Sequence, residues 1–166
     1  ALPSGPTVLD EVANAAFWIG VVLGSQNEYG DITERLSFDD VKHNFLTASR
    51  QGLNAGLHWV DGQTVAAPKL ILETLIPLAH AGLEAYVDQS EIDKYLGVIQ
   101  DRVERCGTGS EWMMRSLSEM KDRGTRSERM SALTAAIADR QRGGKPCHEW
   151  SLARLEEAGG WTQNYV

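Results

Sequence analysis

Cysteine is scarce in this sequence. Cys106 and Cys147 are the only two, they lie far apart, and neither belongs to a Cys-X-X-Cys pattern. We therefore expect neither a structural zinc site nor a disulfide scaffold. Reduced thiols are typical of a cytoplasmic protein, and the cytoplasm is the location that we expect.

An excess of positive charge and a long apolar run are also missing. The net charge of −7 argues against a broad nucleic-acid-binding surface. The longest apolar run, residues 15–24, is well short of the roughly 20 residues that a membrane span needs, so it predicts a buried helix. No signal peptide is visible. We expect neither nucleic acid nor a membrane as a partner.

What the sequence does contain is a series of helix start signals, separated by glycine-rich turns. Capping or first-turn residues predict helices that start near Thr7, Ser37, Pro68, Ser90, Thr108 and Thr125. Gly52 and Gly143–Gly144 are placed to end two of them, and Pro77 should kink the third. Residues 57–66 carry Asp61-Gly62 between two short β-prone runs, which predicts a hairpin.

The predicted fold class is mainly all-α: a helical bundle of about six helices with one small β-hairpin near residues 57–66. We expect a single helical domain over residues 1–166. The sequence begins without Met, which suggests a piece of a longer protein. The first helix is apolar nearly all round, so most of it should be buried and a homodimer is one way to cover the rest.

One face of the predicted second helix could bind an anion. At helical spacing His43, Thr47 and Arg50 share a narrow face, opposite the apolar line of Val41, Phe45 and Ala48. A guanidinium suits a carboxylate or phosphate because it donates two parallel hydrogen bonds. A cation in the last turn of a helix also stabilises the helix dipole without any ligand. The sequence leaves both interpretations of Arg50 open.

Two further stretches contain groups that could carry chemistry. In residues 105–112, glycines flank Thr108 at a helix start, where backbone N–H groups could hold an anion, although a capped turn is the simpler interpretation. A phosphate-binding P-loop is excluded because Gly-Lys-Ser/Thr is absent. Residues 144–150 contain Cys147 and His148 without metal-ligand spacing, so we expect a structural histidine and no metal site.

Three segments together resemble the C-terminal helical half of the glutamate–cysteine ligase family. They are residues 2–22, residues 44–59 and the pair 106–112 with 146–150, and the likeness covers most of the chain. Its most specific part is the pattern of Asn44, Phe45, Ala48, Arg50, Gly52, Leu53 and Ala55. The likeness is strongest to the bacterial carboxylate–amine ligase-like branch, in which such a segment sometimes precedes a pair of CBS domains.

The resemblance implies that this chain is one part of an enzyme whose catalytic centre lies in another part of the same protein. Members of the family are ATP-dependent ligases that phosphorylate the γ-carboxyl of glutamate, after which an amine such as that of cysteine attacks. ATP and Mg²⁺ are implied for the full-length protein, held by an antiparallel sheet upstream of Ala1, with none bound to this chain. The chain would not act alone and would supply no catalytic residue.

The residues that the resemblance assigns to the substrate pocket wall are Arg50, with Asn44 and Thr47 placing it, and Thr108 and Gly109. The partners are then the upstream sheet, glutamate and an amine. The alternative is a regulatory, scaffold or dimerisation module derived from the same family without catalysis. The sequence leaves open which amine would be ligated and whether catalysis is retained.

Overall fold

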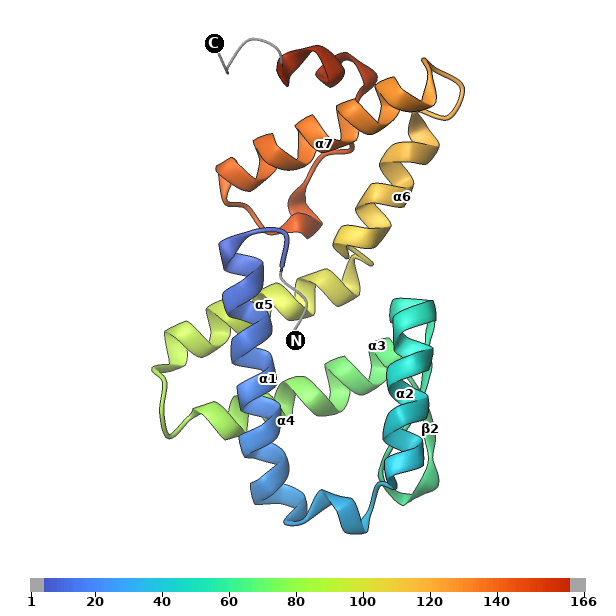
Figure 1. The fold of residues 1–166 in the computed structure, drawn as a ribbon. Helices are drawn as coiled ribbons and strands as arrows, with labels where there is room; N and C mark the ends of the chain where they lie inside the picture. Colours follow the sequence, from blue (N-terminus) through green and yellow to red (C-terminus); the bar gives the residue numbers. More distant parts are fainter. Residues whose placement is uncertain (1–4, 162–166) are drawn as a thin grey trace. The chain divides into compact units, whose positions relative to one another are not determined.

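The computed structural model describes residues 5–161 and is mainly helical (Figure 1). The chain divides into two compact units, residues 12–104 and residues 1–11 with 105–166, where the sequence led us to expect one domain. Within the described residues there are six helices if the segments from α3 to α4 are counted as one, and one antiparallel hairpin. The predicted fold class is therefore confirmed.

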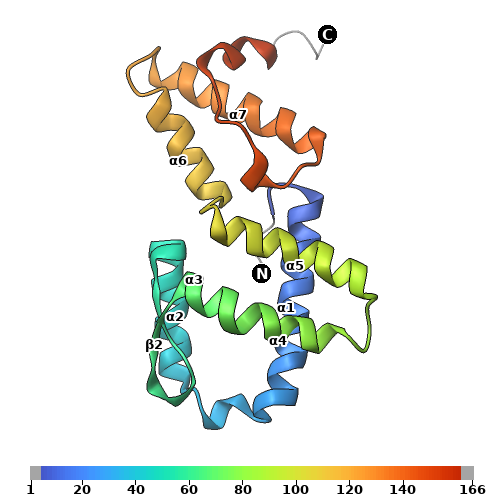
Figure 2. The ribbon, with the colours of Figure 1, turned by 180° about the vertical axis from the view of Figure 1, so that it is seen from behind.

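In the unit of residues 12–104, the core forms where the long helix α1 (Val8–Tyr29) crosses the helix around Pro77 and packs beside α5 (Gln89–Glu104). The middle helix comprises α3 (Ala67–Leu70), the π-helical turn η4 (Ile71–Leu75) and α4 (Ile76–Leu83). The core side chains are Ala79, Leu83, Ile92 and Leu96, with Ala16, Phe17, Val21, Ile76 and Val87 against them. The crossing of α1 and α4 is visible in Figures 1 and 2, which view the molecule from opposite sides.

Pro77 explains the π-helical turn before it. Proline has no N–H to donate to the carbonyl four residues earlier, and its ring collides with that carbonyl in a regular α-helix. The wider turn of Ile71–Leu75 accommodates this defect, since such bulges are a usual cause of a bend in a helix. The expected irregularity at Pro77 thus takes the form of a π-helical turn.

The second helix and the hairpin pack together in the same unit. Helix α2 (Phe38–Gln51) begins after Ser37, whose hydroxyl accepts a hydrogen bond from the Asp40 N–H, and ends at Gly52 with φ of +55°. Strands β1 (Gly56–His58) and β2 (Thr64–Ala66) pair antiparallel, with Leu57 opposite Val65. A 3₁₀ turn, η3 (Val60–Gly62), joins them. The helix start, the helix end and the hairpin were all predicted.

The other unit is built around α6 (Gly109–Glu119) and α7 (Arg126–Gly143). Its core comprises Trp112, Met120, Ala132, Leu133, Ala136 and Ala153. Thr125 and Glu128 form the predicted capping box, and Gly144 ends α7 in the left-handed conformation. After α7 come two 3₁₀ segments, η5 (Cys147–Glu149) and η6 (Leu155–Trp161).

Two predictions about helices are wrong. Helix α5 begins at Gln89, so Ser90 lies inside its first turn instead of capping it. Helix α1 is not mostly buried: Trp18, Ile19 and Val22 are about half exposed. By length and composition α1 could also cross a membrane, a test that core helices of soluble proteins pass as well. The apolar pattern showed that the helix has apolar faces, but it could not show which of them has a partner.

Candidate functional site

Helix α2 contacts the hairpin through polar groups. The Asn44 side-chain amide donates to the His58 carbonyl at 2.6 Å, and the His58 backbone N–H donates to Asn44 Oδ1 at 2.7 Å. Asn44 therefore completes the hydrogen bonding of β1 in the way that a neighbouring strand would. This pair fixes the helix against the hairpin and places the side chains of His58 and α2 together.

An aspartate–histidine pair lies beside this contact. Asp40 Oδ1 is 2.7 Å from Nδ1 of His58, and the Ser37 hydroxyl donates to the other carboxylate oxygen at 2.6 Å. The hydrogen bond from Ser37, followed by that from His58, lowers the pKa of Asp40. An ionised Asp40 can only accept, so the Nδ1–H of His58 donates to it. Both side chains are over a third exposed, so solvent reaches the pair.

A second histidine extends this group along α2. The His43 ring stacks on the His58 ring with centroids 4.6 Å apart and planes at 18°. Thr47 Oγ1 lies 3.3 Å from His43 Nε2, one turn further along the helix. The predicted proximity of His43 and Thr47 is therefore present. We call Asp40, His43, Asn44, Thr47 and His58 the histidine cluster.

Arg50 lies in the last turn of α2, beyond the histidine cluster. Its side chain is exposed, and among residues 5–161 it forms no ion pair. By helical geometry it lies on the same side of α2 as His43 and Thr47. An exposed, unpaired guanidinium on this polar face can bind an oxyanion, and it also stabilises the C-terminal end of the helix dipole.

Thr108 and Gly109 belong to the other unit. Thr108 Oγ1 accepts a hydrogen bond from the Glu111 N–H at 3.2 Å, so its hydroxyl caps α6. Gly109 opens that helix, and a Cβ there would lie 3.0 Å from Cγ of Pro6. Of the five residues predicted for the substrate pocket, the fold thus groups Asn44, Thr47 and Arg50 on α2, whereas Thr108 and Gly109 form a capped turn elsewhere.

The sequence alone did not reveal the pairing of Asp40 with His58. By its position in the sequence Asp40 is an acid in the first turn of a helix, and His58 is a residue of the predicted hairpin. The two residues are 18 positions apart, and no local spacing connects them. The one residue that could have indicated the pair is Asn44. Its side-chain amide can form hydrogen bonds with the backbone at the edge of a strand, and these bonds place the hairpin against this face of α2.

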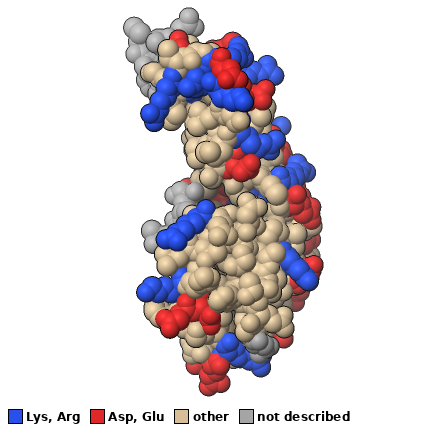
Figure 3. Space-filling view, turned by 90° about the vertical axis from the view of Figure 1, so that its right-hand side faces the viewer, with Lys and Arg blue, Asp and Glu red and all other residues tan. Residues whose placement is uncertain are grey.

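The opposite face of α2 is apolar and exposed. The exposed fractions are 80% for Phe38, 46% for Val41 and 74% for Phe45, and α2 contributes no buried side chain to the described structure. In Figure 3, surface free of acidic and basic side chains covers a broad area of the unit of residues 12–104, with charged groups at its margins. We call Phe38, Val41 and Phe45 the α2 apolar line.

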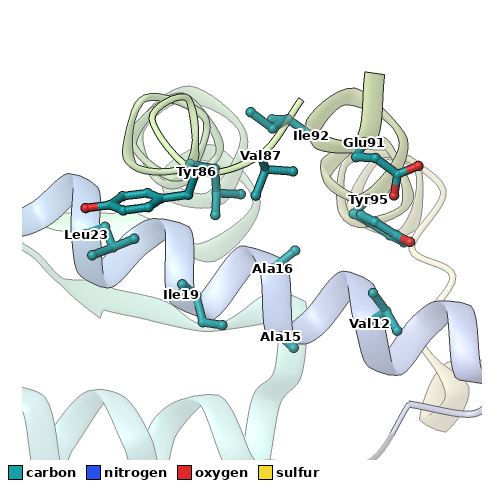
Figure 4. A pocket seen from close by; sticks show the side chains of 11 residues that line it. Val12, Ala15, Ala16, Ile19, Leu23, Tyr86, Val87, Glu91, Ile92 and Tyr95 are labelled. Carbon is teal, nitrogen blue, oxygen red and sulfur yellow. The ribbon is translucent and has the colours of Figure 1, made fainter. Parts of the chain in front are cut away.

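A hollow of about 520 Å³ lies in the same unit, where α1 passes the end of α4 and the start of α5 (Figure 4). Its walls are apolar apart from the tips of a few side chains. The lining residues are Val12, Ala15, Ala16, Ile19, Leu23, Leu83, Tyr86, Val87, Glu91, Ile92 and Tyr95. Val12 and Ile19, two exposed apolar side chains of α1, thus form part of one wall of a groove.

The described residues do not form a magnesium site. No group of three or more His, Cys, Asp or Glu side chains among residues 5–161 is placed to hold a metal ion. The Asp40–His58 pair provides one carboxylate, and Mg²⁺ prefers several oxygen ligands. What this part of the chain offers to an anionic ligand is the guanidinium of Arg50.

No protein-family model matches the chain, and comparisons with curated proteins and with solved structures give no match either.

Proposed function

We propose that this chain is the helical part of an ATP-dependent carboxylate–amine ligase of the glutamate–cysteine ligase type. In this proposal α2 turns its polar face, with Arg50, toward an anionic substrate group at the catalytic sheet, and its apolar line packs against another part of the full-length protein. The proposal rests on the family resemblance of residues 44–59 and on one structural observation. That observation is the pairing of an exposed apolar line with an unpaired arginine on opposite faces of α2.

The two faces of α2 have separate roles. Burial of apolar surface drives association, and Phe38 and Phe45 together offer two large side chains that the described residues leave uncovered. The two hydrogen bonds between Asn44 and His58 hold α2 against the hairpin. Docking of the apolar line would therefore not need to change the position of α2 relative to the hairpin. The guanidinium of Arg50 can bind a carboxylate or phosphate through two parallel hydrogen bonds.

The test uses the full-length protein with ATP, Mg²⁺, glutamate and a panel of amines, and it measures phosphate release. We expect amine-dependent release from the unmodified protein. Arg50→Ala should raise the KM for glutamate or ATP by about tenfold or more, because a charge-assisted hydrogen bond is lost. Lys42→Ala is the matched control: it removes an exposed cation from the same helix and should leave both constants unchanged.

Two results would count against the proposal. Unchanged kinetic constants for Arg50→Ala would remove the role of Arg50 in substrate binding. Absence of amine-dependent phosphate release from the unmodified protein would remove the ligase activity itself, whatever Arg50 does.

The groove beside α1 favours a second candidate, a dimerisation or regulatory module without catalysis. Val12, Ala15, Ile19 and Val22 are spaced as positions a and d of a heptad, the spacing through which helices pair. In this case Ile19→Glu should convert a dimer to a monomer in sedimentation experiments, whereas Lys42→Glu should not. A monomeric unmodified protein would contradict this candidate.

A further inference from the structure

The fold brings together two stretches that are 40 residues apart in the sequence. Residues 105–115, which include the first turns of α6, and the segment from Cys147 to Leu152 line one pocket of about 250 Å³. All of its lining residues belong to the unit of residues 1–11 and 105–166. We call it the tryptophan pocket, after Trp112 and Trp150 in its wall.

The two segments are fixed against each other. The Cys147 N–H donates to Oδ2 of the buried Asp10 at 3.1 Å, and its thiol donates to the Gly107 carbonyl at 3.2 Å. Gly107 allows this approach, because a Cβ there would lie 2.4 Å from Cβ of His148. The pocket is therefore preformed in the fold, which lowers the cost of ordering it around a ligand.

The inner wall of the pocket offers aromatic surface. The rings of Trp112 and Trp150 are 5.2 Å apart and nearly perpendicular. Their indole N–H groups already donate to backbone carbonyls, that of Trp112 to Ser151 and that of Trp150 to Lys145. Trp112 is only 4% exposed and the Arg140 guanidinium lies 5.5 Å from the centre of its ring, so the ring of the half-buried Trp150 is the aromatic surface that remains for a flat apolar group.

The rim of the pocket is cationic. Arg105 and Arg115 both line it, and none of the described lining residues is acidic. Arg115 is exposed and forms no ion pair within residues 5–161. A guanidinium beside aromatic surface matches a ligand that carries an oxyanion at one end and a planar ring at the other.

We propose that the tryptophan pocket binds a small aromatic carboxylate, with its ring against Trp150 and its carboxylate at Arg115. The volume lies below the roughly 300–1,000 Å³ of pockets for larger ligands, which limits the occupant to about one ring. The site uses none of the residues of the histidine cluster or of Arg50. It therefore stands independently of the proposed ligase function.

The experiment titrates benzoate into the full-length protein and follows tryptophan fluorescence together with calorimetry. Inorganic phosphate supplies the charge without the ring, and benzyl alcohol supplies the ring without the charge. Saturable benzoate binding is expected, with each of the other two compounds bound at least about tenfold more weakly, because each lacks one of the two contacts.

Arg115→Met removes the charge and keeps much of the side-chain volume, and it should weaken benzoate binding by about tenfold or more. Arg126→Met removes an exposed arginine of the same unit outside the pocket and should leave the affinity unchanged. If Arg115→Met unfolds, Arg115→Lys replaces it and should still weaken binding, since an ammonium lacks the planar fork.

Three outcomes would overturn the assignment. They are the absence of saturable benzoate binding, equal affinity for benzoate and inorganic phosphate, and equal loss of affinity in the Arg115 and Arg126 variants.

Discussion

Helices α1 and α4 approach each other at glycines, and this contact gives the sharpest test of the fold. A Cβ on Gly24 would lie 2.0 Å from the carbonyl oxygen of Leu78. A Cβ on Gly82 would lie 2.2 Å from the carbonyl oxygen of Gly20. Because the opposing atoms are backbone atoms, no change of rotamer can relieve these contacts. Gly24→Ala must therefore push the two helices apart.

The size of the effect follows from the distances. Real Cβ contacts essentially never fall below 3.0 Å, so the Gly24 variant requires a shift of at least 3.0 − 2.0 = 1.0 Å. Overpacking of this kind costs roughly 1–3 kcal/mol, and a backbone clash belongs at the upper end. Alanine is about 1 kcal/mol more favourable than glycine inside a helix, which offsets part of this cost. The net loss of stability is then about 2 kcal/mol, or about 10 °C in Tm for a unit of this size.

Thermal and urea unfolding followed by far-UV circular dichroism measure this loss. Gly97→Ala is the control, because Gly97 also lies inside a helix, α5, but a Cβ there would meet nothing within 4 Å. That variant should gain roughly 0.5–1 kcal/mol from propensity alone. If Gly24→Ala unfolds at or above the Tm of the unmodified protein, the close packing of α1 on α4 is refuted.

Three further predictions concern local hydrogen bonds. Thr125→Ala removes the cap of α7 and should cost about 1 kcal/mol in urea unfolding, whereas Thr134→Ala, at an exposed position inside that helix, should cost nothing. The folded-state pKa of Asp40 is lowered from 3.8, so its stabilisation is present above that value and is lost as the pH falls through the folded pKa. The Tm difference between the unmodified protein and Asp40→Asn should therefore be largest near about pH 7 and shrink toward about pH 3; a difference that grows on acidification would contradict this. Asn44→Ala should cost roughly 1–3 kcal/mol and speed amide exchange in β1, while Asn54→Ala, at an exposed position, should do neither.

Much of the local structure could be predicted because its causes are local. Ser37 and Thr125 cap helices through hydrogen bonds to residues three positions on, and Gly52 and Gly144 end helices with positive φ. Each of these signals acts within one turn of the chain. The exception is Ser90, one residue after the actual start of α5, where several polar residues compete for the cap.

The candidate site could be predicted only in part. The shared face of His43 and Thr47 follows from helical periodicity and is present in the structure. The pairing of Asp40 with His58 depends on how the hairpin packs on α2, and the tryptophan pocket depends on how residues 105–112 meet residues 147–152. Contacts of this kind join residues that no short pattern relates.

The sequence by itself determined where most of the helices begin, where two of them end, where the hairpin turns and which helix faces are apolar. It did so because capping, glycine conformation and side-chain periodicity act over a few residues. Only the tertiary structure decided that Phe45 and Ile19 remain exposed while Gly24 is buried against α4. The physical reason is that a periodic pattern gives the direction of an apolar face, whereas its burial depends on whether another element of the fold packs against it.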